Sequence, residues 1–240
     1  MPADRPNTLS RQVLDQLGQA IVSGVHPPGT TLRIEDLQAD FGVSRTVIRD
    51  VLRYLESLHL TRSRPRVGVR VTPRSHWNVF APDVVHWRLA GPDAPAQLVS
   101  LTQLRTAVEP QAAELAAMNA PEHVGAELVA LAETMAALAA AGDLDAFLAA
   151  DLTFHSLLLQ HCGNEMFAAL DAPIGEALKA RHARHLVPDH PRDIAVLLHQ
   201  LVATGIREQD GPTAAAAMRR LVTEAGTVVA AARAGTTDHA

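Results

Sequence analysis

The sequence predicts a mainly α-helical protein in which an N-terminal winged helix-turn-helix is followed by an all-α helical bundle. Three observations support this prediction. Residues 37–71 fit two short helices joined by a tight turn, followed by a small β-hairpin. Residues 72–95 contain four prolines, which exclude one long helix there. From residue 95 onward apolar residues recur at helical spacing, and no alternating β pattern intrudes.

The first expected elements are a helix over residues 9–23 and the helix-turn-helix after it. Apolar residues on one face of the first helix are Val13, Leu14, Leu17, Ala20 and Ile21. The Gly42-Val43-Ser44 turn ends one helix and begins the next, because the Ser44 hydroxyl can accept a hydrogen bond from a free backbone N–H of the first turn. The apolar face of the second helix is expected at Val47, Val51, Leu52, Leu55 and Leu58.

Arginines gather at the start of that second helix and around the hairpin. Arg45, Thr46 and Arg49 fall at the exposed helix start, where arginine can make a bidentate contact to guanine in the major groove. The hairpin region carries Arg62, Arg64, Arg66 and Arg70, beside a turn with Pro65 and Gly68. Residues 1–76 have a net charge of +4 and the remainder has −9. Solvated arginines would explain part of this pattern, but the preceding helix, the wing and the charge split together favour binding of double-stranded DNA.

A linker and a helical domain are expected after the wing. The linker carries one short helix near residues 83–89, and burial of Trp77 and Trp87 is expected to anchor the two parts of the chain to each other. Proline and glycine then divide the bundle into segments near residues 95–119, 121–141, 143–162, 164–187, 191–209 and 212–234. The predicted domains are therefore 1–74 for the winged helix-turn-helix, 75–95 for the linker and 96–236 for the helical domain.

The composition indicates whether the protein is secreted, membrane-bound or cytoplasmic. The sequence has no run of 18 apolar residues and no charged-then-apolar leader, so we expect neither a membrane span nor a signal peptide. Its single cysteine, Cys162, cannot form an intrachain disulfide, which favours a reduced, cytoplasmic location.

One pair of polar residues in the bundle has a spacing that points to a site. Asp151 and His155 are four residues apart in DLTFH, so they project from the same helical face among apolar neighbours. A metal ion, a ligand carboxylate or hydroxyl, or a mutual hydrogen bond would each satisfy such a pair, and the spacing alone leaves all three open.

Residues 21–71 resemble the DNA-binding domain of GntR-family bacterial transcription regulators. The resemblance is carried by Ser23-Gly24, Pro28-Gly29, Leu32, Ser44-Arg45-Thr46, Arg49 and Gly68, with Val47 where many members have proline. It implies a homodimer that places two recognition helices on an inverted-repeat operator. The DNA contacts it implies fall on Arg33, Ser44, Arg45, Thr46, Arg49, Arg66 and Gly68, with Arg45 and Arg49 reading bases.

The helical part resembles the ligand-binding FCD domain of the FadR-type branch of that family. The matching residues are Arg105, Glu109, Pro110, Asp151, Phe154, His155, Gly163, Asn164, His199 and Asp210. The resemblance implies a divalent metal such as Zn²⁺ on Asp151, His155 and His199, but Leu221 stands at the fourth ligand position and cannot coordinate. Metal-free binding of a small carboxylate effector by Arg105, Asp151, His155 and His199 stays open, and so does a structural ion pair between Arg105 and Glu109.

A local match in the linker indicates the chemical class of the effector. Trp77, Asn78, Asp83, Val84 and Trp87 resemble an element of sugar-acid regulators of the galactonate-responsive type. We therefore expect a regulator, most simply a repressor, that a sugar acid such as an aldonate releases from its operator. The alternatives are a regulator that responds to another organic or fatty acid, and a metal-dependent hydrolase or lyase. The sequence offers no nucleophile elbow or phosphate-binding glycine loop, so we expect no enzyme.

Overall fold

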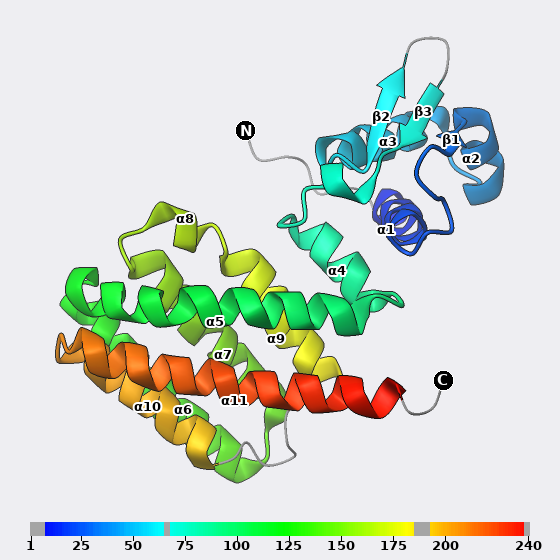
Figure 1. The fold of residues 1–240 in the computed structure, drawn as a ribbon. Coiled ribbons are helices and arrows are strands. Elements are labelled where there is room, and N and C mark those ends of the chain that lie inside the picture. Colours follow the sequence, from blue (N-terminus) through cyan, green and yellow to red (C-terminus); the bar gives the residue numbers. More distant parts are fainter. Residues whose placement is uncertain (1–7, 65–67, 185–192, 238–240) are drawn as a thin grey trace. The chain divides into compact units, whose positions relative to one another are not determined.

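The computed structural model describes residues 8–64, 68–184 and 193–237 of the 240-residue chain. The chain divides into two compact units, Met1–Ala94 and Pro95–Ala240 (Figure 1). The first is a small helical unit with a short sheet, and the second is all-helical where it is described, so the predicted fold class is confirmed.

The first unit has the helix order of a winged helix-turn-helix. Its elements are α1 (Thr8–Val22), β1 (Thr31–Leu32), α2 (Ile34–Phe41), α3 (Arg45–Ser57), β2 (Thr61–Arg64), β3 (Gly68–Val71), η1 (Arg74–His76) and α4 (Pro82–Ala90). Gly42 ends α2 in the left-handed conformation at φ 64°, and the Ser44 side chain accepts a hydrogen bond from Val47 N at the start of α3, as the sequence predicts. The hairpin gains a third strand that the sequence did not predict, because β1 pairs with β3 to give the antiparallel order β1-β3-β2.

The core of the first unit differs from the prediction at one position of α3. Ile48 is fully buried and takes the core place expected for Val47, which packs only partly against the same cluster. Trp77 and Trp87 also lie in this core. A Cβ on Gly18 would come within 2.6 Å of the Trp87 ring, so only glycine lets α1 approach α4 this closely. The burial of both tryptophans is confirmed, whereas their expected role in joining the two units stays a prediction.

A polar network holds α4 against α1 and α3. Asp83 of α4 accepts hydrogen bonds from Arg11 Nη2 at 2.8 Å and from the Tyr54 hydroxyl at 2.6 Å. Arg11 also donates to Asp15 at 2.9 Å, and Trp87 Nε1 donates to the same carboxylate at 2.9 Å. The segment expected as a linker therefore has its helix bonded to the helix that carries the recognition residues.

The second unit is a bundle of long helices. They are α5 (Ala94–Asn119), α6 (Glu122–Ala141), α7 (Leu144–His161), α8 (Glu165–Ala168), α9 (Asp171–Ala183), α10 (Asp193–Arg207) and α11 (Gly211–Thr237). Asp143 and Asn164 cap the starts of α7 and α8, and Asp210 accepts a hydrogen bond from Thr213 N at the start of α11. The single helix expected over 164–187 is two, α8 and α9. Pro173 falls in the first turn of α9, where a missing N–H costs nothing, and this position favours a new start there.

One described helix, α6, has the length and apolar composition of a membrane span. This is weak support for a span, because the core helices of globular bundles pass the same test. Helix α6 buries Leu128, Ala132 and Met135 in the bundle core and exposes Glu127 and Glu133.

The Asp83 network gives a stability prediction for the first unit. Replacing Asp83 by asparagine should lower the free energy of unfolding by about 1–2 kcal/mol at neutral pH, because Arg11 and Tyr54 lose a charged acceptor. Urea unfolding followed by tryptophan fluorescence measures this unit specifically, since both tryptophans lie in it. The matched control is D50N, which removes an exposed carboxylate of α3 and should leave the midpoint unchanged.

Acid should erase the difference between the wild type and D83N. Burial would raise the pKa of Asp83, but hydrogen bonds from Arg11 and Tyr54 outweigh it and lower the pKa below its ordinary value. The stabilisation is thus present above the unfolded pKa of about 3.9 and is lost as pH falls through the lower folded value. A difference that persists below that range would contradict the role assigned to the carboxylate.

Candidate functional site

The start of α3 presents the residues expected to read DNA. Arg45, Thr46 and Arg49 are exposed, and the Arg45 side chain, at 63% exposure, makes only a loose ion pair with Glu35 at 3.5 Å. Ser44 is occupied as the cap of the helix. The capped N-terminus of α3 therefore holds two arginine side chains free to reach base edges.

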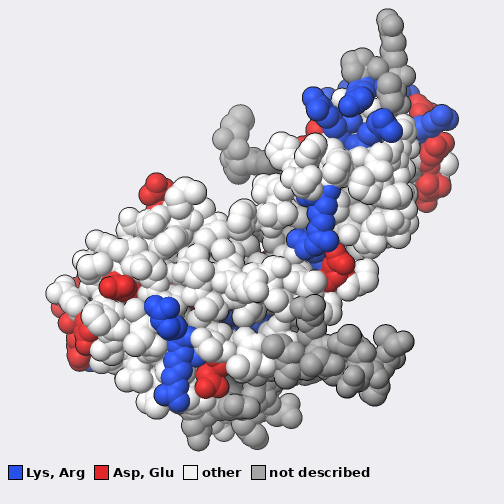
Figure 2. Space-filling view, in the orientation of Figure 1, with Lys and Arg blue, Asp and Glu red and all other residues white. Residues whose placement is uncertain are grey.

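The wing and the turn before α2 add further exposed arginines. Arg33 lies exposed directly before α2, and Gly68 begins β3 at φ 102°, a conformation that favours glycine. Arg62 and Arg70 face each other across β2 and β3, but Arg70 donates to the Gly29 carbonyl at 3.0 and 3.1 Å and thus supports the fold. Figure 2 shows Lys and Arg side chains gathered at the wing end of this unit. Arg66, predicted as a wing contact, lies outside the described residues.

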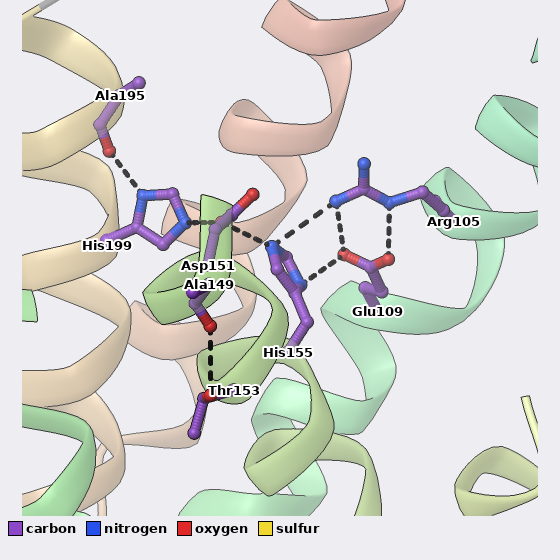
Figure 3. A network of polar contacts seen from close by, with 8 residues as sticks. All are labelled: Arg105, Glu109, Ala149, Asp151, Thr153, His155, Ala195 and His199. Atoms are coloured by element: carbon purple, nitrogen blue, oxygen red, sulfur yellow. Dashed lines mark hydrogen bonds and ion pairs between the residues drawn. The ribbon is translucent and has the colours of Figure 1, made fainter. Parts of the chain in front are cut away.

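In the second unit three predicted residues converge within the bundle (Figure 3). Helix α7 supplies Asp151 and His155, and α10 supplies His199. Asp151 Oδ1 lies 3.0 Å from His199 Nε2 and 3.4 Å from His155 Nε2. One donor atom from each of the three residues lies within 4.8 Å of the others, and both histidines are buried.

Arg105 and Glu109 of α5 complete this cluster. Arg105 binds Glu109 through two atoms, Nε to Oε1 at 2.6 Å and Nη2 to Oε2 at 3.2 Å. Glu109 Oε2 also lies 3.1 Å from His155 Nδ1, a contact at ion-pair distance without hydrogen-bond geometry. The structural ion pair left open by the sequence is thus present, and it occupies the Nε and Nη2 edge of the guanidinium.

Opposite charges control the protonation of the cluster. Burial would raise the pKa of Glu109, but Arg105 and His155 lower it to about 2. Burial would lower the pKa of His155, but the carboxylates of Glu109 and Asp151 outweigh this and raise it to about 9. Hydrogen bonds with both histidines likewise hold the pKa of Asp151 well below its usual range, against the effect of burial. Without a bound metal ion, the cluster thus holds two carboxylates, the imidazolium of His155 and the guanidinium of Arg105.

The donor set has the chemistry of a divalent-metal site. His199 Nδ1 lies 2.8 Å from the Ala195 carbonyl, which directs Nε2 towards Asp151. Glu109 faces Nδ1 of His155 in the same way, with Nε2 again towards Asp151. Such partners on the far ring nitrogen are typical of metal-binding histidines. Leu221, at the expected fourth position, is buried in the apolar core, so three protein ligands are available here.

Two polar residues of this region were absent from the sites predicted from the sequence. Glu109 was expected only as an ion-pair partner of Arg105, which lies one helical turn before it, and not as a neighbour of His155. Arg181 follows the buried Ile174 of α9 by two turns and therefore falls on the inward face of that helix. Its Nε is buried and has no hydrogen-bond partner.

Comparisons with known proteins agree with this arrangement of sites. Residues 9–71 match the family "Bacterial regulatory proteins, gntR family" and residues 100–224 match the FCD domain. The galactonate operon transcriptional repressor of Escherichia coli K12 is 31% identical over 205 residues, which cover 85% of this chain and 89% of the relative. The uncharacterized HTH-type transcriptional regulator YieP of the same organism is 28% identical over 89% of this chain and 92% of its own length.

A solved structure shares the fold. Escherichia coli McbR/YncC matches with a TM-score of 0.51 at 19% identity, covering 95% of this chain and 99% of that protein. The family and these relatives are transcription regulators, which removes the hydrolase or lyase alternative. With both domains matched over most of its length, the chain belongs to the GntR family of bacterial transcription regulators, in the branch whose second domain is an FCD domain.

Proposed function

We propose that the helical domain of this regulator binds a small carboxylate, a sugar acid such as an aldonate, and that binding releases the first unit from its operator. The observation that carries the proposal is the buried cluster of Arg105, Asp151, His155 and His199, whose donors and acceptors match a carboxylate and several hydroxyls. Polar groups buried inside a helical bundle are costly unless they are satisfied, and a polar ligand satisfies them. Similarity to a galactonate operon repressor supports the same ligand class.

The same cluster is proposed to hold one divalent cation, such as Zn²⁺, on Asp151, His155 and His199. The outward ring nitrogens are already directed by Ala195 and Glu109, so both Nε2 atoms are aimed at one point beside Asp151. Three protein ligands leave coordination positions for effector or water. A metal would add positive charge to the site and raise its affinity for a ligand rich in oxygen atoms.

For DNA, we propose that a homodimer places its two α3 helices in successive major grooves of an inverted-repeat operator. Arg45 and Arg49 read bases there, while Ser44, Thr46 and Arg33 position the helix, and the wing with Arg66 and Gly68 reaches backbone or minor groove. The effector controls this complex only as far as it prefers one arrangement of the domains over the other. A bacterial protein that binds an operator acts in the cytoplasm, because the DNA lies there.

A thermal-shift panel tests the ligand class. Aldonates, uronates, hydroxy acids and fatty acids are added one at a time to the full-length protein, and an aldonate is expected to raise the melting temperature most, because only the ligand-bound folded state gains binding energy. If only a fatty acid or another organic acid raises the melting temperature, the protein is still a ligand-responsive regulator, but the sugar-acid assignment is wrong.

Zinc titration followed by calorimetry tests the metal. The H199A variant should bind Zn²⁺ at least about tenfold more weakly than wild type, since one of three ligands is gone. H123A, which removes an exposed histidine of α6, is the control and should bind as wild type does. If H199A binds Zn²⁺ as tightly as wild type does, or if neither protein binds it, the proposed metal site is wrong and the effector binds to a site without a metal.

Operator selection from random DNA tests the reading residues. Against the sequence selected by wild type, R45A and R49A should each lose about 1–3 kcal/mol of binding free energy and relax the preference at particular bases. R53A removes an equally charged, 69% exposed arginine further along α3 and should lose only the general phosphate attraction. Unchanged sequence preference in R45A and R49A would contradict base reading by these side chains.

A further inference from the structure

Helices α7 and α9 run antiparallel, and three contacts fix their register. The Ser156 hydroxyl donates to Asp171 at 2.9 Å, a Cβ on Gly175 would lie 3.5 Å from the Leu152 side chain, and His182 Nε2 lies 2.9 Å from Asp145. Each step towards the C-terminus of α9 therefore matches an equal step towards the N-terminus of α7. By this register the backbone of Arg181 lies near the start of α7, roughly 7 Å of helix rise from the level of Asp151.

The side chain of Arg181 is directed back along that distance. It shares the inward face of α9 with the buried Ile174, and helical side chains lean towards the N-terminus of their own helix. For α9 that direction leads to the level of Asp151. The pKa of Arg181 is consistent with this placement: burial lowers it to about 10, the charge of Arg105 adds to the decrease, and Asp151 and Glu109 oppose it.

Arg181 is an unpaired cation in this region. Its Nε is shielded from solvent without a hydrogen-bond partner, and its guanidinium makes no ion pair with the described side chains of residues 9–64, 68–184 and 194–227. Arg105 differs, because Glu109 already holds it through two atoms. Of the two guanidiniums near Asp151, that of Arg181 is therefore the one without an ion-pair partner among the described side chains.

We propose that Arg181 is the residue that binds the carboxylate of the effector, while Arg105 is held by Glu109 and supports the wall of the site. The assignment rests on the proposed effector function and adds a direction to it. The carboxylate of a polyhydroxy acid lies at the α9 side, and its hydroxyls lie towards Asp151, His155 and His199. An uncharged sugar or lactone lacks the group that pairs with Arg181 and is therefore a poor ligand.

A half-buried cation with a shielded, unbonded Nε costs stability in the free protein and is useful only in the complex. The R181Q variant should therefore melt at the same or a higher temperature than wild type without ligand, yet gain less from the ligand. A purely structural arginine would show the opposite, with a lower melting temperature when it is replaced. The change in melting temperature without ligand and the change in the ligand-induced increase together distinguish a binding role from a packing role.

Calorimetry with D-galactonate and the neutral D-galactonamide tests the carboxylate contact. Wild type should prefer the acid, whereas R181Q should bind it about ten- to hundredfold more weakly, the range for a charge-assisted hydrogen bond, and should lose most of the preference over the amide. The control, K179Q, removes a positive charge from the exposed face of the same helix and should bind as wild type does.

The outcomes separate this inference from the function on which it rests. If R181Q binds D-galactonate as tightly as wild type does, or keeps the full preference for the acid, Arg181 does not hold the carboxylate, and the effector function stands. If wild type binds neither D-galactonate nor any other sugar acid in the panel, the sugar-acid function itself fails, and the assignment of Arg181 fails with it.

Discussion

The buried carboxylate of Glu109 is the group on which the site of the second unit depends. It is fully buried and touches both Arg105 of its own helix and His155 of α7. Removing one partner of such a cluster leaves an uncompensated charge in the core, which costs far more than a surface ion pair contributes. Glu109 therefore fixes α5 against α7 and, through His155, sets the direction of the ring that faces Asp151 and His199.

Helix α5 also links this cluster to the DNA-binding unit through a short covalent path. It begins at Ala94, only a few residues after α4 ends at Ala90. In the first unit α4 holds Tyr54 of α3 through Asp83, and α3 carries Arg45 and Arg49. A ligand that changes the position of α5 thus also acts on α4, the helix directly before it. Helix α4 is in turn bonded to α3 through Asp83 and Tyr54. This continuity gives the proposed release from DNA a physical route.

The sequence predicts most of this fold because strong local signals mark its boundaries. Gly42 and Ser44 define the turn, and proline and glycine separate most bundle helices. Periodicity alone missed the break between α8 and α9. It also missed the pairing of Thr31–Leu32 with β3, which depends on partners 39 and 37 positions away. For the site, spacing predicts Asp151 with His155, but it cannot show that Glu109 takes the Nε and Nη2 edge of Arg105 or that the Nε of Arg181 is buried without a partner among the described residues. Those facts arise only when helices distant in sequence pack together.

The charges of the cluster limit which effector it can hold. With His155 protonated, Arg105, Arg181 and the imidazolium outnumber Glu109 and Asp151 by one positive charge, so a single carboxylate balances the site. If a divalent cation replaces that proton, the surplus rises to two. The metal would lower the pKa of a water or hydroxyl group held beside Asp151, His155 and His199, and the deprotonated group would supply the second negative charge. An α-hydroxy acid such as an aldonate offers both groups on adjacent carbons. An aldonate therefore balances the site with or without the metal through its own two groups, whereas a fatty acid, which has no hydroxyl, balances the metal form only together with a bound water.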